Sequence, residues 1–412
     1  MYNVGFGDCF LLYLPADGNC RQLVLVDFGR HLSSTSGHAL SEVADDLIRE
    51  ARRNAPDGRA FFDVIVATHR HYDHIAGFDL KAAEQFEAGE VWLPWVENPD
   101  DPEAVALKQA QFDLADALEN TLSPSDPSRA LLNNSHHSFT NQHGLSNHGA
   151  MSNLQAGFKS GATIRYLPTP EEGRTLPSDG QLFGVKVHVL GPSRDEEVIA
   201  QLKPPKGKYY EFADQQLGRS PAPTVLVSGS SPLAGRFGHE YVVTKGAYRK
   251  RFERLFDDAS FEHLRKAATF DTGMAATKLE DMINGTSLVL ALEVGSAVVL
   301  LGGDAEYGTW KVILKDPEWR KLLARTTVYK VSHHGSYNGT PLEFGESLLP
   351  DTALSLVSLC AMERWPSIPR KSLIESLGRG ERQLVRTDAD AESSAGAVVE
   401  RTDLYVDVEV PT

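Results

Sequence analysis

The alternation of apolar and polar positions along the chain predicts strands and helices in a mixed order. Two apolar runs rich in β-forming residues, Phe10–Leu14 and Leu23–Asp27, flank a turn-like Pro-Ala-Asp-Gly-Asn segment and predict a hairpin. Apolar residues at helical spacing predict a helix over Leu40–Arg53, which ends before Pro56. The nearly continuous apolar run Phe61–Ala67 then predicts a strand that is buried on both faces.

The rest of the chain also contains apolar runs separated by polar segments. Apolar runs predict further strands at Phe183–Leu190, Ser287–Leu292, Ala297–Leu301, Val328–Val331 and Ala353–Leu359. The strands Ser287–Leu292 and Ala297–Leu301 are expected to form a second hairpin. A short helix is expected over Leu373–Leu377. Strand groups at both ends of the chain, with helices between them, predict an α/β fold in which helices sandwich two mixed sheets.

Two long segments break this pattern, and we interpret them as insertions at about residues 97–180 and 194–283. The first begins with an amphipathic helix, Ala104–Leu122, and continues into a polar His/Asn/Ser-rich run at 133–153. That run is either a lid over a site or an ordinary surface loop. A chain of 412 residues usually forms two or three domains, but a double-sheet sandwich with such insertions accounts for residues 1–412 as one domain.

Composition narrows the expected partners and location. The 41 Lys+Arg and 56 Asp+Glu give a net charge of −15, which argues against binding of long nucleic acid and favours a small or short substrate. The longest apolar stretch, Ser287–Gly303, is interrupted by Glu293 and Gly295, so no membrane span is expected. The start of the chain has no secretory pattern and the three cysteines have no close pairs. We therefore expect a cytoplasmic protein without disulfides.

Four potential metal ligands follow the strand Phe61–Ala67 within six positions: His69, His71, Asp73 and His74. Histidines two positions apart at a strand end can point the same way, and the turn after them brings Asp73 and His74 toward the same point. Imidazole and carboxylate suit Zn²⁺, with Mn²⁺ or Fe as alternatives. A solvated polar loop is the competing interpretation, but histidine clusters of this density rarely lack a role.

Further strands end in residues of the same chemical kind. The second hairpin runs through two glycines into Asp304, which would either cap the next helix or bridge two cations. Val328–Val331 is followed by His333 and His334, which would point to opposite faces of an extended segment, so that one binds metal and the other lies beside it or contacts substrate. Asp27, at the end of its strand, would either form a turn or hold a ligand histidine through its second nitrogen.

Together these motifs resemble the metallo-β-lactamase superfamily. The matching segments are THRHYDHIAG (68–77), LGGDAE (301–306), KVSHHGS (330–336) and the opening VGFGDCFLL (4–12). Within the superfamily they most resemble the branch found in the soluble domain of the ComEC competence proteins and in bacterial choline-phosphate esterases. The resemblance extends to about Leu377 with the insertions unmatched. It implies an αββα sandwich with a dinuclear metal site at one edge of the sheets, in enzymes that mostly hydrolyse esters, lactones or phosphodiesters.

The resemblance also implies a role for each candidate residue. The first metal would be bound by His69, His71 and one histidine of the 333/334 pair, the second by Asp73 and His74, with Asp304 bridging both. Asp27 would support the ligands from the second shell of contacts. Two zinc ions are therefore expected.

The chain departs from that branch at one position. There the second metal often takes a further histidine from a His-Pro step that opens the last helix, whereas the matching step here is Ile368-Pro369. Trp365-Pro366, the other register, offers no ligand either. Either water completes the second site or a residue from elsewhere does, and the candidates are His188, Glu363 and the histidines within residues 136–148. For His188, a hydrogen-bonded structural role is the more natural interpretation.

The ligand set and the resemblance predict a hydrolase that uses a metal-bound hydroxide. Asp73 would accept a hydrogen bond from the nucleophile, and the unused histidine of the pair, such as His334, or Ser336 would donate to the developing oxyanion. A phosphodiester or phosphate-containing small molecule is the expected substrate, and Arg70 would favour phosphate unless its side chain points away to solvent. The alternatives are a lactone or thioester hydrolase, a nuclease acting on short strands, and a regulatory or partner-binding protein with a structural metal site.

Overall fold

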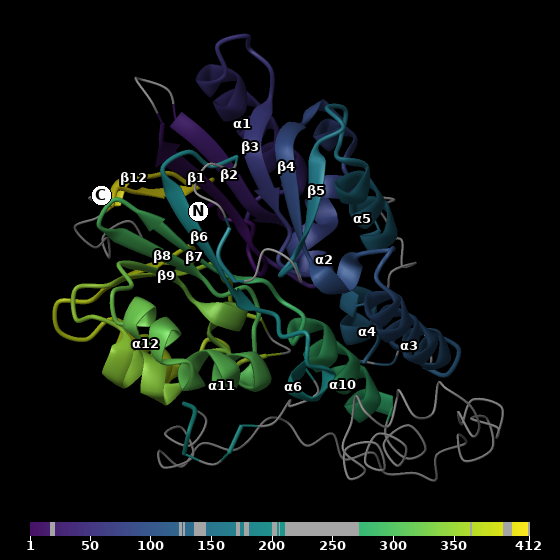
Figure 1. Ribbon diagram of the computed structural model, residues 1–412. Coiled ribbons are helices and arrows are strands. Elements are labelled where there is room, and N and C mark those ends of the chain that lie inside the picture. Colours follow the sequence, from purple (N-terminus) through teal and green to yellow (C-terminus); the bar gives the residue numbers. More distant parts are fainter. Residues whose placement is uncertain are drawn as a thin grey trace.

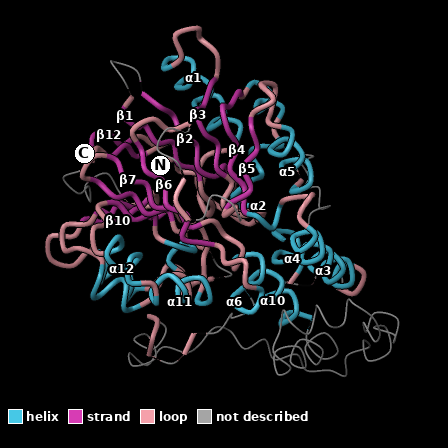
Figure 2. Tube along the Cα trace, in the orientation of Figure 1, coloured by secondary structure: helices cyan, strands magenta, loops and turns pink. Residues whose placement is uncertain are grey.

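Two mixed β-sheets stack face to face in the computed structural model, and helices cover both outer faces (Figure 1). The structure describes residues 1–16, 21–122, 126, 128–135, 146–169, 174–176, 181–199, 204–205, 207–210, 272–362, 365–389 and 398–410. Figure 2 shows the strands at the centre and the helices around them. The chain is therefore an α/β protein with two sheets flanked by helices, as the pattern of apolar positions predicts.

The first sheet contains its strands in sequence order: β1 (Cys9–Pro15), β2 (Arg21–Phe28), β3 (Phe61–Val66), β4 (Glu87–Pro94) and β5 (Thr163–Leu167). β1 and β2 form the predicted antiparallel hairpin, and β2 to β5 run parallel. The sequence pattern does not predict β4 or β5. Because β5 pairs with β4, the range 97–180 contributes a strand to the sheet as well as peripheral helices.

The second sheet has the order β11-β10-β9-β8-β7-β6. Its strands are β6 (Val185–Gly191), β7 (Val289–Val294), β8 (Ala297–Leu301), β9 (Val328–Lys330), β10 (Leu354–Val357) and β11 (Gln383–Arg386). β7 is antiparallel to both of its neighbours, and β8 to β11 run parallel. A separate hairpin of β12 (Val398–Arg401) and β13 (Val406–Val408) lies near the N-terminus, where Tyr2 bridges to Tyr405.

Alternate residues of the facing strands build the core between the sheets. Valines of β2 and β3 meet leucines of β7 and β10 there: Val24, Val26, Val64, Val66, Leu290, Leu292, Leu354 and Leu356. The residues in between point to the opposite faces, where Leu25 and Ile65 pack with the helix α1 (Leu40–Asn54). Both faces of these strands are therefore buried, which explains their nearly continuous apolar sequences.

The helices fall into three groups. α1, α2 (Tyr72–Ile75) and α5 (Asn147–Ala156) pack on the first sheet, and α11 (Tyr307–Lys315), α12 (Pro317–Leu323) and α13 (Lys371–Leu377) pack on the second. α3 (Pro102–Glu119), α4 (Arg129–Ser135) and α10 (Thr272–Asn284) pack on one another. Shorter helical segments are α6 (Glu196–Ile199), Ala76–Asp79, Lys81–Gln85, Trp95–Glu97, Ser332–Gly335 and Phe344–Leu348. Among the residues described, no helix is long and apolar enough to cross a membrane.

Candidate metal centre

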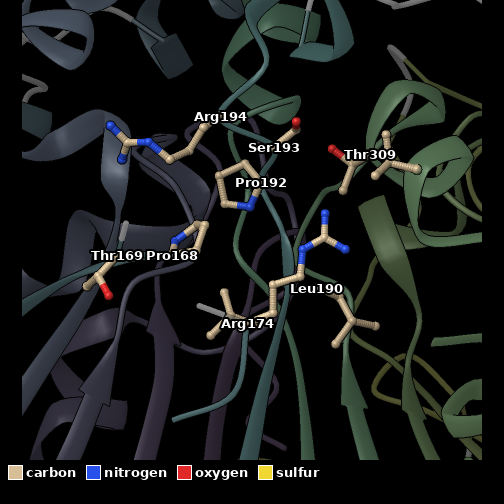
Figure 3. Close-up of a pocket in the computed structure, with 10 residues that line it drawn as sticks. Pro168, Thr169, Arg174, Leu190, Pro192, Ser193, Arg194 and Thr309 are labelled. Carbon is tan, nitrogen blue, oxygen red and sulfur yellow. The ribbon is translucent and has the colours of Figure 1, made fainter. Parts of the chain in front are cut away.

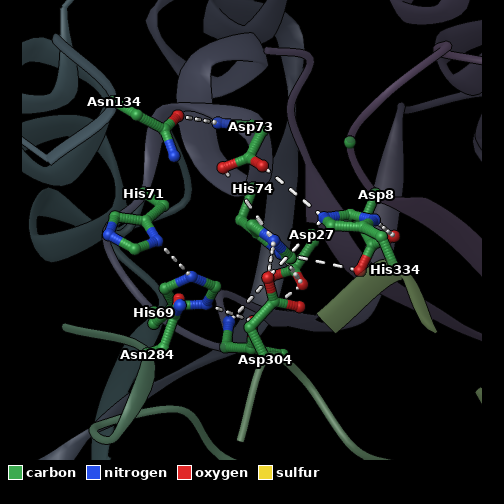
Figure 4. Close-up of polar contacts among 12 residues, drawn as sticks. Asp8, Asp27, His69, His71, Asp73, His74, Asn134, Asn284, Asp304 and His334 are labelled. Carbon is green, nitrogen blue, oxygen red and sulfur yellow. Dashed lines mark hydrogen bonds and ion pairs between the residues drawn. The ribbon is translucent and has the colours of Figure 1, made fainter. Parts of the chain in front are cut away.

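Candidate ligands gather where strands of both sheets end (Figure 4). The segment after β3 carries His69, His71, Asp73 and His74, the turn after β8 carries Asp304, and the turn after β9 carries His334. All six side chains are buried. Burying so many ionisable groups together costs free energy unless they are paired or bind a cation, so the cluster needs compensating charge.

His74, His334, Asp73 and Asp304 direct donor atoms at a common centre. Asp304 Oδ2 lies 3.2 Å from His74 Nε2 and 3.6 Å from His334 Nε2. Asp73 Oδ2 lies 3.5 Å from His334 Nε2, and its Oδ1 lies 4.0 Å from His74 Nε2. Ligands of a four-coordinate ion with bonds of about 2.0–2.2 Å are separated by roughly 3.3–3.6 Å. The group could therefore hold a metal ion.

The hydrogen bonding of these atoms leads to the same conclusion. His74 Nε2, His334 Nε2 and Asp73 Oδ1 are buried, and none of them has a hydrogen-bond partner in the part of the chain that the structure describes. Nearly all buried polar atoms in proteins are hydrogen-bonded. A bound cation would satisfy all three atoms at once.

Asp27 and a backbone carbonyl fix the orientation of the two histidines. Asp27 Oδ2 lies 2.8 Å from His74 Nδ1 and accepts a hydrogen bond from Thr68 Oγ1 at 2.8 Å. Ser358 O lies 3.0 Å from His334 Nδ1. These contacts favour a proton on each Nδ1 and leave each Nε2 facing the centre. Asp27 thus has a positive φ of 56°, as in a turn, and also contacts His74 through its second nitrogen, so both roles considered for it from the sequence fit the structure.

Thr68 extends the influence of Asp27 to His69. Because the Thr68 hydroxyl donates its proton to Asp27, it can only accept from His69 Nδ1, which lies 3.1 Å away. His69 Nε2 is therefore unprotonated, and it faces His71 Nδ1 at 3.0 Å. The rings of His69 and His74 are tilted by 50° with centroids 4.1 Å apart, so the His69–His71 pair lies directly beside the first group.

Asp8 and Lys330 are buried partners of the cluster that sequence reasoning missed as site residues. Asp8, His74, Asp304 and His334 offer ligand atoms that all lie within 4.8 Å of one another. The contacts of Asp8 are with His74 Nδ1 at 3.6 Å and His334 Nδ1 at 3.7 Å, and it forms an ion pair with Lys330. Lys330 Nζ also lies 3.5 Å from Asp304 Oδ1. Asp8 therefore contacts the ligand histidines on the side away from the four-donor centre.

The side chains of the adjacent histidines 333 and 334 point to different places, but the backbone there is not the extended segment that the sequence predicts. Both have φ of 50°, so the segment is a left-handed turn and not an extended strand end. His334 joins the ligand group, whereas His333 Nε2 lies 3.3 Å from Asn284 Nδ2 and its Nδ1 lies 3.4 Å from Glu306 Oε1. The His333 side chain is 19% exposed, against 1% for His334. His333 is thus the member of the pair with access to solvent.

Other residues considered from the sequence lie in distinct places. Ser336 is buried and its hydroxyl donates to Asn338 Oδ1 at 2.8 Å, so that donor is already engaged. Ile368 packs in a small apolar cluster with Phe6 and has no ligand atom to offer. His188 belongs to β6 and lies 2.5 Å from Glu293 Oε1, which is the structural role expected of it. Glu363 and residues 136–145 lie outside the described residues, and His148 is exposed.

The protonation of the cluster follows from burial and neighbouring charge. Burial alone would lower the pKa of His74, but the carboxylates around it, Asp304 first, raise this pKa well above its usual value. Burial would raise the pKa of Asp73 and of Asp304, but His74 holds both well below the usual range. Burial lowers the pKa of His69 strongly and that of His71 to about 3. His69 and His71 are therefore neutral imidazoles at neutral pH, which is the form that binds metals.

A helix of the first expected insertion contacts the ligand loop, and a helix of the second contacts that helix. Asn134 of α4 accepts a hydrogen bond from the Asp73 backbone N–H at 3.3 Å, and Ser135 Oγ lies 3.3 Å from His71 Nε2. Ser135 also donates to Glu280 of α10 at 3.2 Å. Burial and the nearby Asp73 carboxylate raise the pKa of Glu280 well above its usual value. The insertions therefore supply part of the wall of the candidate site.

Arg70 and two arginines that line a separate cavity are engaged by carboxylates. Arg70 is buried and paired with Glu97, so it points neither to solvent nor to a substrate. A cavity of about 270 Å³ at the ends of β5 and β6 is lined by Arg174 and Arg194 (Figure 3). Each of these two guanidiniums pairs with an aspartate. None of the three arginines therefore offers unbalanced positive charge for a phosphate.

Comparison with known proteins adds no family assignment. No protein-family model matches the chain, and a search of curated proteins gave no match. The geometry of the cluster and the motifs that form it are therefore the basis for assigning a function.

Proposed function

We propose that this chain is a metal-dependent hydrolase of the metallo-β-lactamase type, which acts on a phosphodiester or another phosphate-containing small molecule. The observation that carries the proposal is the convergence of donor atoms from four residues, His74, His334, Asp73 and Asp304, on one buried centre. The order of the motifs and the two stacked sheets agree with the αββα arrangement of that superfamily.

Two metal ions are proposed. One would be bound by His69 Nε2 and His71 Nδ1, and the other by the group around His74 and His334, with Asp304 between them. The mixture of imidazole and carboxylate suits Zn²⁺, with Mn²⁺ or Fe as alternatives. Such ions lower the pKa of water and polarise an ester or phosphoryl oxygen.

The remaining side chains would orient the reacting groups. Asp73 would accept a hydrogen bond from the attacking water. His334 is a proposed ligand and the Ser336 hydroxyl is engaged, so neither is free to donate to the oxyanion. His333 is not free to donate either, because Asn284 Nδ2 can only donate to its Nε2 and Glu306 Oε1 faces its Nδ1. Lys330 would balance the negative charge of Asp8 and of Asp304, whose Oδ1 it faces.

The resemblance favours phosphate over a lactone or thioester. His334 lies with His74, Asp73 and Asp304, so it would serve the second metal and not the first, to which the resemblance assigns it. It would thereby supply the imidazole that Ile368 cannot, which weakens the regulatory alternative, and the first metal would keep His69, His71 and Asp304. The site therefore does not depend on a histidine from the last helix.

Metal content and turnover, measured on the same preparations, test the proposal. Protein purified without a polyhistidine tag or chelator is analysed by inductively coupled plasma mass spectrometry and assayed with bis(p-nitrophenyl) phosphate, p-nitrophenyl acetate and a homoserine lactone. We expect two metal equivalents and phosphodiester turnover. Asp304→Asn and His334→Ala should abolish turnover while the fold is retained by circular dichroism, and exposed His148→Ala should behave as the parent.

Three outcomes would contradict parts of the proposal. A parent protein that takes up no Zn²⁺, Mn²⁺ or Fe would refute the metal centre. Undiminished turnover in Asp304→Asn would refute its catalytic role. Hydrolysis of the lactone and not of the phosphodiester would refute the phosphate substrate while leaving the metal centre in place.

A further inference from the structure

Ser135 of the insertion helix α4 contacts His71 on the side away from His69, and Glu280 of the insertion helix α10 contacts Ser135. Ser135 is the last residue of α4, and Glu280 lies on α10. The two helices pack through apolar residues that include Leu132 and Leu279. Ser135 is 2% exposed, so its hydroxyl is held between the imidazole and the carboxylate without competition from bulk water.

The hydrogen bonds of Ser135 determine which nitrogen of His71 carries the proton. Ser135 has one hydroxyl proton, and it donates this proton to Glu280 Oε1 at 3.2 Å. Toward His71 Nε2, 3.3 Å away, the hydroxyl can only accept. His71 therefore carries its proton on Nε2, and Nδ1 is left with a free lone pair.

His69 is held in the complementary tautomer by Thr68 and Asp27, with its proton on Nδ1 and a lone pair on Nε2. His69 Nε2 and His71 Nδ1 are 3.0 Å apart, so two lone pairs face each other. This arrangement is repulsive unless a proton or a metal ion lies between them. A metal ion bound between the two nitrogens would remove this repulsion and use both lone pairs.

We propose that Ser135 and Glu280 form a relay of positioning residues that holds His71 in the tautomer required to bind a metal ion through Nδ1. This inference rests on the proposed metal centre and adds to it the reason why α4 and α10 are part of the site. His69 and His71 are held in the same way, each by a hydroxyl that is hydrogen-bonded to a carboxylate. Thr68 and Asp27 hold His69, and Ser135 and Glu280 hold His71.

The tautomer of His71 tests the relay in the metal-free protein. Protein labelled with ¹⁵N-histidine is studied by NMR, with the signal of His71 assigned by comparison with His71→Asn. In the parent we expect the chemical shifts of an Nε2-protonated imidazole. In Ser135→Ala and in Glu280→Ala we expect a mixture of tautomers, whereas Ser135→Thr, which keeps the hydroxyl, should retain the parent signal.

Metal affinity provides the second readout. We expect Ser135→Ala to weaken the binding of one Zn²⁺ equivalent about 10–100-fold, which is the usual cost of removing an outer partner of a ligand histidine, and to leave the other equivalent unchanged. The matched control is Ser152→Ala, an exposed serine on α5. Titration against a chromophoric chelator measures both equivalents.

The outcomes separate this inference from the proposed function. A parent that binds no metal refutes the metal centre, and the tautomer measurement then still decides the relay. A parent that binds two equivalents, with unchanged His71 shifts and unchanged affinity in Ser135→Ala, overturns the relay and leaves the hydrolase proposal in place. If Ser135→Ala does not fold, Glu280→Ala and Ser135→Thr give the same comparison.

Discussion

The guanidinium of Arg70 makes a double hydrogen bond with the carboxylate of Glu97, with Nε 2.8 Å from Oε1 and Nη2 2.5 Å from Oε2. The Arg70 atom Cζ lies 4.7 Å from the ring centroid of Phe112, and Lys108 Nζ lies 3.5 Å from Glu97 Oε2. Arg70 stands between two candidate ligands in sequence, yet it ties their loop to α3 and the segment before it. The arginine within the motif is an anchor of the loop.

Replacing Arg70 should destabilise the protein strongly. Arg70→Met leaves the carboxylate of Glu97 buried, where it is 2% exposed, without its main partner. Breaking a buried pair in this way costs about 3–5 kcal/mol. Urea denaturation measures the change. Lys321→Met, at the exposed pair with Glu318, is the control and should change the free energy of unfolding by about 0–1 kcal/mol. Equal effects of the two substitutions would contradict the anchoring role.

The same pair predicts a loss of stability in acid. Burial would raise the pKa of Glu97, but Arg70 and Lys108 outweigh it and lower this pKa below the ordinary value of 4.5. The ionised carboxylate therefore stabilises the fold at pH above about 4.5, and this contribution disappears as the pH falls through the lower, folded-state pKa. In Glu97→Gln the free energy of unfolding should fall less steeply between about pH 5 and pH 3. If the free energy of unfolding falls equally steeply with pH in the parent and in Glu97→Gln, the Glu97 carboxylate is not the source of the loss of stability.

Asp27 should control metal affinity without contacting the metal. Asp27→Asn weakens the hold on His74 Nδ1 and disturbs the contact with Thr68 that orients His69. We expect the affinity for Zn²⁺ to fall about 10–100-fold, measured by competition with a chelator. Asp57→Asn, at an exposed aspartate paired with Arg59, should bind as the parent does. Parent-like affinity in Asp27→Asn would show that the histidines hold their orientation without it.

Lys330 should act as an internal counter-charge. Its ammonium faces Asp8 and Asp304, and although burial would lower its pKa, these carboxylates raise it above the usual value. Lys330→Met leaves the carboxylates uncompensated, so the metal-free protein should lose about 3–5 kcal/mol of stability. Added Zn²⁺ should then raise the melting temperature more in the variant than in the parent. Lys159→Met, at an exposed lysine, is the control. An equal rise in both proteins would refute the counter-charge role.

Local patterns were sufficient to predict the ligand loop and most strands. The buried run before His69 and the spacing of the four ligands after it are contained within fourteen consecutive residues, Phe61–His74. The left-handed turn at His333 and His334 could not be predicted, because only the surrounding structure imposes a positive φ on histidine. β5 escaped detection because only part of its surface is buried, which left Thr163 and Arg165 in a short and mixed strand sequence.

The remaining partners depend on contacts between distant segments. Asp8 reaches Lys330 across more than three hundred residues, and Ser135 reaches Glu280 across 145. No periodicity or spacing connects such pairs. The glycines around Asp8 and the lysine that opens KVSHHGS were visible signals, but their meaning depends on the two sheets being packed together.

The candidate ligands are divided between the sheets, with His74 following a strand of the first and Asp304 and His334 following strands of the second. A metal ion would therefore bind the assembled protein in preference to either half. By mass action it would add about 4 kcal/mol to the free energy of unfolding when free metal exceeds its dissociation constant about a thousandfold. Metal supply would then set the lifetime of the protein as well as its activity, since a starved population would open between the sheets more often and reach proteases sooner.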